Sequence, residues 1–166
     1  NAFTNNDYTD FYITLPRENI ETAMWLESDR MRNLDLSPEA CATEKSVVIE
    51  EYKQRYLNQP YGDETMLLRS LAYKVHPYRW STIGISPDHI ARATIEDVRR
   101  FYDRYYQPSQ AILSMSADME EERMIDLARQ WFGSIPDMPQ PPRSIPAEPQ
   151  QTAERRLIVE RDVHAT

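Results

Sequence analysis

The chain has 166 residues, of which 40% are apolar and 28% charged, with a net charge of −8, three glycines, three histidines and one cysteine. So few, widely separated glycines leave no P-loop and no G-x-G-x-x-G turn, and the single Cys41 excludes internal disulfides and cysteine zinc ribbons. There is no basic stripe for phosphate backbones and no apolar run of the ~18 residues that span a membrane, so neither nucleic acid nor a membrane span is expected.

The first half of the chain predicts one strand and then three helices. Apolar and polar side chains alternate before Pro16, which is typical of a half-buried strand, and the apolar period then becomes helical. Ser37 and Pro38 predict the start of the second helix, and the third stops before Pro77. The expected strand covers 10–15, and the expected helices cover 18–34, 38–57 and 64–75.

The second half predicts a helix, a strand and another helix. Thr94 and Asp97 form a box-like helix start, with Val98, Phe101, Tyr102 and Tyr105 expected inward. A strand is expected over 111–117, and a helix after Asp118 that ends near Gly133. Its inward residues are Met124, Leu127, Ala128 and Trp131.

Six of the twelve prolines lie between Pro136 and Pro149. This composition is typical of a stiff, extended linker. We therefore expect a partial domain over 1–135, a linker over 136–153, and over 154–166 the start of a strand, at Leu157-Ile158-Val159, that leads into a second domain. The expected fold class is α+β, with helices packed on a mixed or antiparallel sheet.

The expected second helix carries two carboxylates in an unusual position. Seven residues separate Glu44 from Glu51, which places them within about 20° of each other, two turns apart. Val47 and Val48 flank the line between them, so both acids are predicted on the apolar stripe. A buried carboxylate is normally paired, protonated or bound to a cation. The alternative is a solvated face on which Glu51 pairs with Arg55, four residues later.

Several segments together resemble the pitrilysin/insulinase family of zinc peptidases. They are Asn1-Ala2-Phe3-Thr4 with Asp7-Tyr8-Thr9, Leu26-Glu27-Ser28-Asp29-Arg30-Met31, Glu44-Lys45-Ser46-Val47-Val48-Ile49-Glu50-Glu51, His76-Pro77-Tyr78 with Ile83-Gly84, Tyr105-Tyr106-Gln107-Pro108, and Trp131-Phe132-Gly133-Ser134-Ile135-Pro136. Each motif alone is weak, but their order and spacing match over nearly the whole chain.

The resemblance implies a partial pitrilysin-like domain of a zinc-dependent endopeptidase. In that family an H-x-x-E-H motif supplies two histidine ligands and the general base, and a later helix supplies a glutamate ligand. The resemblance places this ligand at Glu51, with Glu44 as the acid that supports the site. The sequence contains no H-x-x-E-H. We expect that motif roughly thirty residues before Asn1, and we expect this chain alone to bind no zinc stably and to be inactive.

The same resemblance implies that Asn1, Ala2, Phe3 and Thr4 form an edge strand that pairs with an extended peptide substrate. The alternatives are a plain edge strand and, for Asn1-Ala2, a tag remnant. Expected partners are the peptide, the preceding segment and a homologous second half, in one chain or in a homo- or heterodimer.

A second class of function stays open, namely a non-catalytic peptide-binding or scaffolding half of such a peptidase. The three histidines do not cluster: His76 is predicted to be a helix-end residue, and His89 and His164 have no partners in the sequence. A lone cysteine is compatible with cytoplasm or periplasm.

Overall fold

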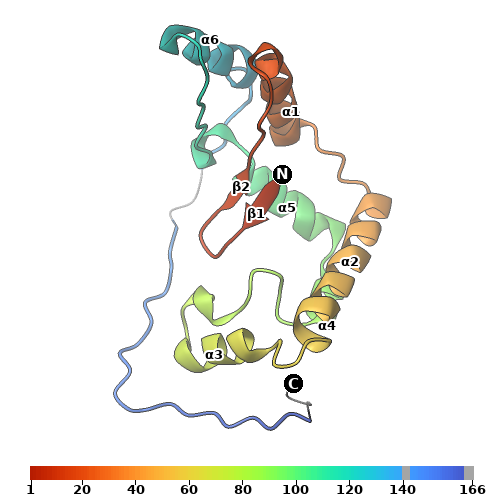
Figure 1. The fold of residues 1–166 in the computed structure, drawn as a ribbon, viewed down its shortest axis with the longest axis vertical. Helices are drawn as coiled ribbons and strands as arrows, with labels where there is room; N and C mark the ends of the chain where they lie inside the picture. The colour runs from red at the N-terminus through yellow and green to blue at the C-terminus, as the bar shows by residue number, and fades with distance from the viewer. Residues whose placement is uncertain (140–142, 163–166) are drawn as a thin grey trace. The chain divides into compact units, whose positions relative to one another are not determined.

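A computed structural model describes residues 1–139 and 143–162 of the chain. It contains six α-helices and a two-stranded sheet among those residues, which confirms the α+β class (Figure 1). The elements in chain order are β1 (Ala2–Thr4), β2 (Thr9–Phe11), η1 (Arg17–Asn19), α1 (Ile20–Arg32), α2 (Pro38–Tyr52), η2 (Lys53–Leu57), α3 (Glu64–Ala72), η3 (Pro77–Arg79), α4 (Pro87–Arg92), α5 (Ile95–Tyr105), η4 (Pro108–Gln110) and α6 (Glu121–Phe132).

The chain divides into two compact units. The first comprises 1–3, 10–38 and 94–141, and the second comprises 4–9, 39–93 and 142–166. Within the first unit α1 packs against α6, and Leu127 of α6 is completely buried while Met24 of α1 is 4% exposed. These apolar side chains form the small core of that unit.

Helix starts follow the sequence closely because capping is local. Thr94 accepts a hydrogen bond from the amide of Asp97, whose carboxylate accepts one from the amide of Thr94, so the predicted capping box at α5 is confirmed. The bonds that Thr94 donates lower the pKa of Asp97. The second helix begins at Pro38, as expected, but its last turn, η2, is π-helical.

The strand predicted over 111–117 is wrong, whereas the strand expected at Leu157-Ile158-Val159 as the start of a second domain stays a prediction. Residues 111–117 and 157–159 are extended without strand pairing, and Ile112 is 96% exposed. A strand needs a neighbour to satisfy its amides and carbonyls, and among the described residues only β1 and β2 pair. The first predicted strand is also shorter, because β2 ends at Phe11.

Three further expectations meet the structure here. Phe101 of α5 is 58% exposed rather than inward, whereas the predicted inward Leu127 is buried. In the parts of the chain that are described, no helix has both the length and the apolar character to cross a membrane. The expected linker and final strand reach into residues 140–142 and 163–166, and those positions lie outside the described residues, as does His164.

Candidate functional site

The acids Glu44 and Glu51 both lie on α2 in the second unit. Seven residues at 1.5 Å of rise separate them by about 10 Å along the helix axis. Lys45 anchors this helix, because its ammonium donates to the carbonyl oxygens of Ala91 at 3.1 Å and Ala93 at 2.9 Å. The two acids therefore lie on one helix whose position is fixed by these hydrogen bonds.

The face that carries the acids is not the buried face of α2. Glu44 is exposed and Val47 beside it is 56% exposed, while the buried residue of the helix is Tyr52. The prediction that the acids lie on a core-facing stripe is wrong in this respect. The helix packs through Lys45 and Tyr52 instead, and the acids remain accessible.

Glu51 forms one ion pair. Its carboxylate lies 2.8 Å from the guanidinium of Arg55, and the two side chains are 42% and 67% exposed. This is the i, i+4 pair foreseen as the ordinary alternative, and such an exposed pair contributes little to stability. Because Arg55 is long and largely solvated, the pair leaves the Glu51 oxygens open to another cation.

Tyr52 fixes the end of α2 directly after Glu51. It is 5% exposed, its hydroxyl donates to the carbonyl oxygen of Ile85 at 2.9 Å, and its ring lies 5.2 Å from that of Tyr56. Burial raises the pKa of Tyr52, so the hydroxyl keeps its proton and remains a donor. The backbone that carries Glu51 is thereby held in place by an interior hydrogen bond.

The residues Asn1 to Thr4 lie in and beside β1, the first strand of a hairpin. The terminal nitrogen of Asn1 donates to the carbonyl of Tyr12 at 3.0 Å, and the amide of Tyr12 donates to the carbonyl of Asn1 at 2.9 Å. Nearer the turn, the hydroxyls of Thr4 and Thr9 are 2.9 Å apart. All three residues of β1 are exposed, as an edge strand requires.

The turn of this hairpin is tied down within the second unit. Asn5 closes the turn with its side-chain oxygen, which accepts from the amides of Asp7 and Tyr8 at 2.8 and 3.0 Å. Tyr78 of η3 donates to the Asp7 carboxylate at 2.5 Å, and this hydrogen bond raises the pKa of Tyr78. Arg69 of α3 donates to the side-chain oxygen of Asn6 at 2.8 Å.

Sequence reasoning missed a carboxylate in the proline-rich segment. The side chain of Glu148 accepts hydrogen bonds from the backbone amides of Lys74, Val75 and His76 at 2.7, 2.8 and 2.8 Å. These bonds, with that of His76 foremost, lower the pKa of Glu148 to about 2. The partners are more than 70 residues apart, so no local pattern could have identified them.

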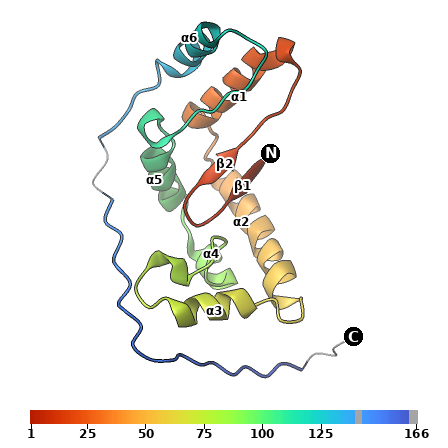
Figure 2. The same cartoon turned by 60° about the vertical axis from the view of Figure 1, so that its left-hand side comes forward.

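The same segment continues along α3. Arg155 donates to the carbonyl oxygens of Leu71 and Ala72 at 3.1 and 2.6 Å, and Arg161 pairs with Asp63 at the other end of the helix. Figure 2 shows this stretch running beside α3. Residues 148–161 are thus fixed to one helix at both of its ends.

Metal donors do not gather among the residues that the structure describes. No group of three His, Cys, Asp or Glu that could hold a metal ion occurs among residues 1–139 and 143–162. His76 accepts from the amide of Tyr78 at 3.2 Å as the cap of η3, which confirms its helix-end role. His89 accepts from the amide of Ile85 at 3.4 Å, and Cys41 is half-buried.

Comparison with known proteins finds similarity to one family model and to proteases. A family model described as "Peptidase M16 inactive domain" matches residues 92–165. The zinc protease PqqE of Helicobacter pylori is 31% identical over 166 residues, which is 98% of this chain and 37% of that protein. The chain therefore spans little more than a third of this curated relative.

Solved structures agree. The crystal structure of a protease from Helicobacter pylori superposes with a TM-score of 0.81 and 31% identity, covering 90% of this chain and 36% of that one. The first half of the periplasmic protease PqqL from Escherichia coli superposes with a TM-score of 0.71 over 88% of this chain and 32% of that one. At 20% identity, the second likeness establishes the fold alone.

Proposed function

We propose, on the premise that this chain belongs to the pitrilysin/insulinase family of zinc peptidases, that it contributes the glutamate ligand and the peptide-binding strand of an enzyme that cleaves extended peptides. The observation that carries the proposal is the accessible carboxylate of Glu51 on α2, with Glu44 aligned two turns earlier. The chain spans only part of its relatives, so the activity of the whole enzyme belongs to the proposal.

This chain would supply one of the protein ligands of a zinc site. A catalytic zinc takes three protein ligands and a water, and glutamate oxygen is one of its usual donors. Glu51 would bind the metal once Arg55 turned aside, and Glu44 would support the site with its negative charge. Bound zinc would supply a water of lowered pKa as the nucleophile. The histidine ligands belong, in this proposal, to an H-x-x-E-H segment outside these 166 residues.

The role assigned to β1 is to hold the substrate backbone. One edge of β1 pairs with β2, and an extended peptide would add to the other edge through main-chain hydrogen bonds. Such pairing fixes the peptide without reading its side chains. The Asx turn at Asn5 and the bonds of Asp7 and Asn6 keep the turn of the hairpin in one conformation, which is useful for a strand that serves as a template.

The ligand assignment is tested on the full-length protein by metal analysis and peptide cleavage. Glu51→Gln should abolish stoichiometric zinc and hydrolysis of a quenched-fluorescence peptide, because an amide is a much weaker zinc ligand than a carboxylate. Glu50→Gln is the matched control, since Glu50 is a neighbouring exposed glutamate of α2 that pairs with Lys53 at 2.6 Å. Unchanged zinc content in Glu51→Gln would refute the assignment.

The 166-residue chain alone should be inactive, because the metal donors of its described residues complete no zinc site by themselves. The measurement is cleavage of the same peptide by the purified chain with added zinc. Hydrolysis that disappears on chelation would contradict this expectation.

The second candidate is a non-catalytic, peptide-binding or scaffolding half. The observation that favours it is the family model described as an inactive domain, which covers residues 92–165. The sequence of the full-length protein before Asn1 separates the two. An intact H-x-x-E-H together with bound zinc supports the peptidase, whereas a replaced motif and no zinc supports the scaffold.

A further inference from the structure

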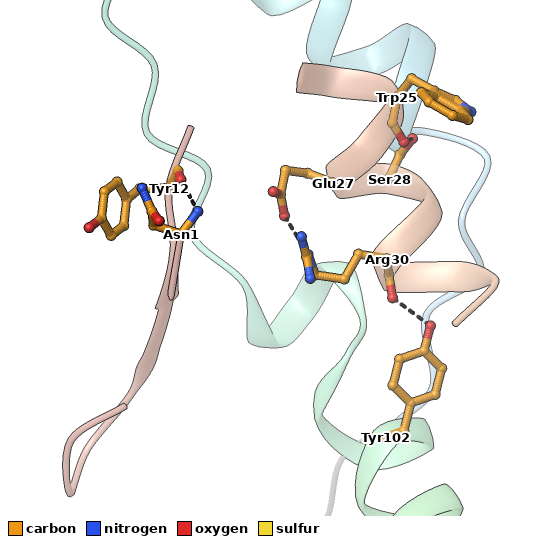
Figure 3. A network of polar contacts seen from close by, with 7 residues as sticks. All are labelled: Asn1, Tyr12, Trp25, Glu27, Ser28, Arg30 and Tyr102. Atoms are coloured by element: carbon orange, nitrogen blue, oxygen red, sulfur yellow. Dashed lines mark hydrogen bonds and ion pairs between the residues drawn. The ribbon is translucent and has the colours of Figure 1, made fainter. Parts of the chain in front are cut away.

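The segment 26–31 contributes to the family resemblance and has no part in the site proposed above. Its two long charged side chains lie together on α1, where Arg30 Nε donates to Glu27 Oε2 at 3.1 Å (Figure 3). Their side chains are 38% and 22% exposed, so the pair is less solvated than the ion pairs elsewhere on α1 and α6. An ion pair that is buried to this degree does more than keep the surface of the protein soluble.

Arg30 also contacts the hairpin. The guanidinium carbon lies 4.5 Å from the centre of the Phe11 ring in β2, which is a cation–π distance. The ring of Tyr106 also meets Phe11 in an edge-type contact, with 6.1 Å between the ring centres. Phe11 therefore contacts a cation and an aromatic ring, both from residues outside the sheet.

These contacts close into a circuit. The ring of Tyr106 lies 4.9 Å from that of Tyr102, and the Tyr102 hydroxyl donates to the carbonyl oxygen of Arg30 at 2.7 Å. Figure 3 shows this last bond at the end of α1. Burial raises the pKa of both tyrosines, so the hydroxyl of Tyr102 stays protonated as the donor. Arg30 is thus fixed through its backbone as well as through its side chain.

Glu27 fixes the guanidinium from the other side. Its second oxygen, Oε1, is buried and has no hydrogen-bond partner in the described part of the chain. A buried carboxylate oxygen without a donor is costly unless a cation lies close. The Arg30 guanidinium is that cation, so the pair is mutually dependent: Glu27 orients Arg30, and Arg30 compensates Glu27.

Phe11, which these contacts hold, is next in sequence to the residue that pairs with Asn1 at the start of β1. Tyr12 follows Phe11 directly, and its amide and carbonyl form the two hydrogen bonds to Asn1. We propose that Arg30, oriented by Glu27, is a positioning residue for peptide binding: it fixes Phe11 and through it the strand β1. The inference rests on the proposed function, because β1 matters for substrate only if a peptide pairs with it.

The experiment compares variants of the full-length protein. Arg30→Met keeps the aliphatic stem but removes the charge, and the expected result is a KM for a long extended peptide raised about threefold, the ratio that corresponds to an exposed cation–π contact. The kcat and the zinc content should stay unchanged, and Arg30→Lys should recover part of the loss. Arg123→Met is the matched control, because Arg123 of α6 pairs with Glu21 of α1, the helix that carries Arg30, at 3.2 Å rather than with the hairpin.

A second measurement does not depend on catalysis. Amide hydrogen exchange of residues 1–4 and 11–12 should be faster in Arg30→Met than in Arg123→Met. A drop of the unfolding temperature with equal changes in all segments, and without a rise in KM, would mean a merely structural role and would overturn the proposal. If the wild-type protein cleaves no peptide, the proposed function is refuted. The exchange data alone then decide whether Arg30 positions the strand. Acceleration confined to the hairpin then supports positioning of the strand, and no acceleration refutes it.

Discussion

Replacing Tyr52 by phenylalanine tests how the end of α2 is held beside Glu51. The substitution removes one oxygen and leaves the ring and its tilted contact with the ring of Tyr56 in place. The main interaction lost is the 2.9 Å hydrogen bond to the carbonyl oxygen of Ile85, beside a weaker 3.5 Å contact with the sulfur of Met66, and the side chain is 5% exposed. A hydrogen bond of this kind contributes about 1 kcal/mol net to the free energy of unfolding.

The neighbouring tyrosine provides the internal comparison. Tyr56 is half-buried, and its hydroxyl lies 3.3 Å from that of Ser81, which is long for a bond between two hydroxyls. Tyr56→Phe should therefore lower the free energy of unfolding by less than about 0.5 kcal/mol. The two variants remove the same atom from adjacent turns of the chain and differ in the burial and in the hydrogen-bond partners of that atom.

The assay is thermal unfolding of both variants, followed by amide exchange of residues 48–57. Tyr52→Phe should lower the midpoint of thermal unfolding by about 2–4 °C, which corresponds to 1 kcal/mol in a chain of this size. Faster exchange should centre on the end of α2. Equal losses in the two variants, or a larger loss in Tyr56→Phe, would refute the reasoning that the bond to Ile85 fixes this end of the helix.

Three other predictions follow from the structure. Leu127→Ala should lower the free energy of unfolding, measured by urea denaturation, by about 3 kcal/mol, because it empties a completely buried position. Ile125→Ala, at a 40% exposed position of the same helix, should lower it by less than about 1 kcal/mol in the same assay. Thr94→Ala should cost about 1 kcal/mol by breaking the capping box of α5, seen as faster exchange in its first turn. The pKa of Glu148 is lowered from 4.5 to about 2, so the contribution of its carboxylate to stability is present above pH 4.5 and is lost as the pH falls through about 2. Amide exchange at residues 74–76 should show this loss, and Glu148→Gln should abolish the pH dependence.

Features that depend on neighbours in sequence could be predicted. The capping box at Thr94 and Asp97, the start of α2 at Pro38 and the i, i+4 pair of Glu51 with Arg55 all involve residues within one helical turn. Their geometry is set by the backbone of a single helix, and the rest of the fold has little influence on it. The sequence pattern and the structure therefore agree at these places.

Features that depend on distant partners could not be predicted. The alternation over 111–117 has the composition of a strand, but pairing requires a neighbouring strand that no local pattern encodes. Periodicity placed Glu44 among apolar residues without revealing which face of α2 would be covered, and that face turned out to be the one with Lys45 and Tyr52. The contact of Arg30 with Phe11 joins residues on different elements and has no signal in the spacing.

The π-helical turn η2 follows α2 directly and ends this helix at Leu57. A π turn holds one residue more than an α turn between the same hydrogen-bonded ends. Loss of a single residue within Lys53–Leu57 would therefore be absorbed by a return to α-helical pitch, and the chain after Leu57 would keep its position. Glu44 and Glu51 precede the wide turn and would keep their alignment. We thus expect related chains to have insertions and deletions after Glu51 and few before it. The helix would tolerate changes of length at its C-terminal end and not in the part that carries the two acids.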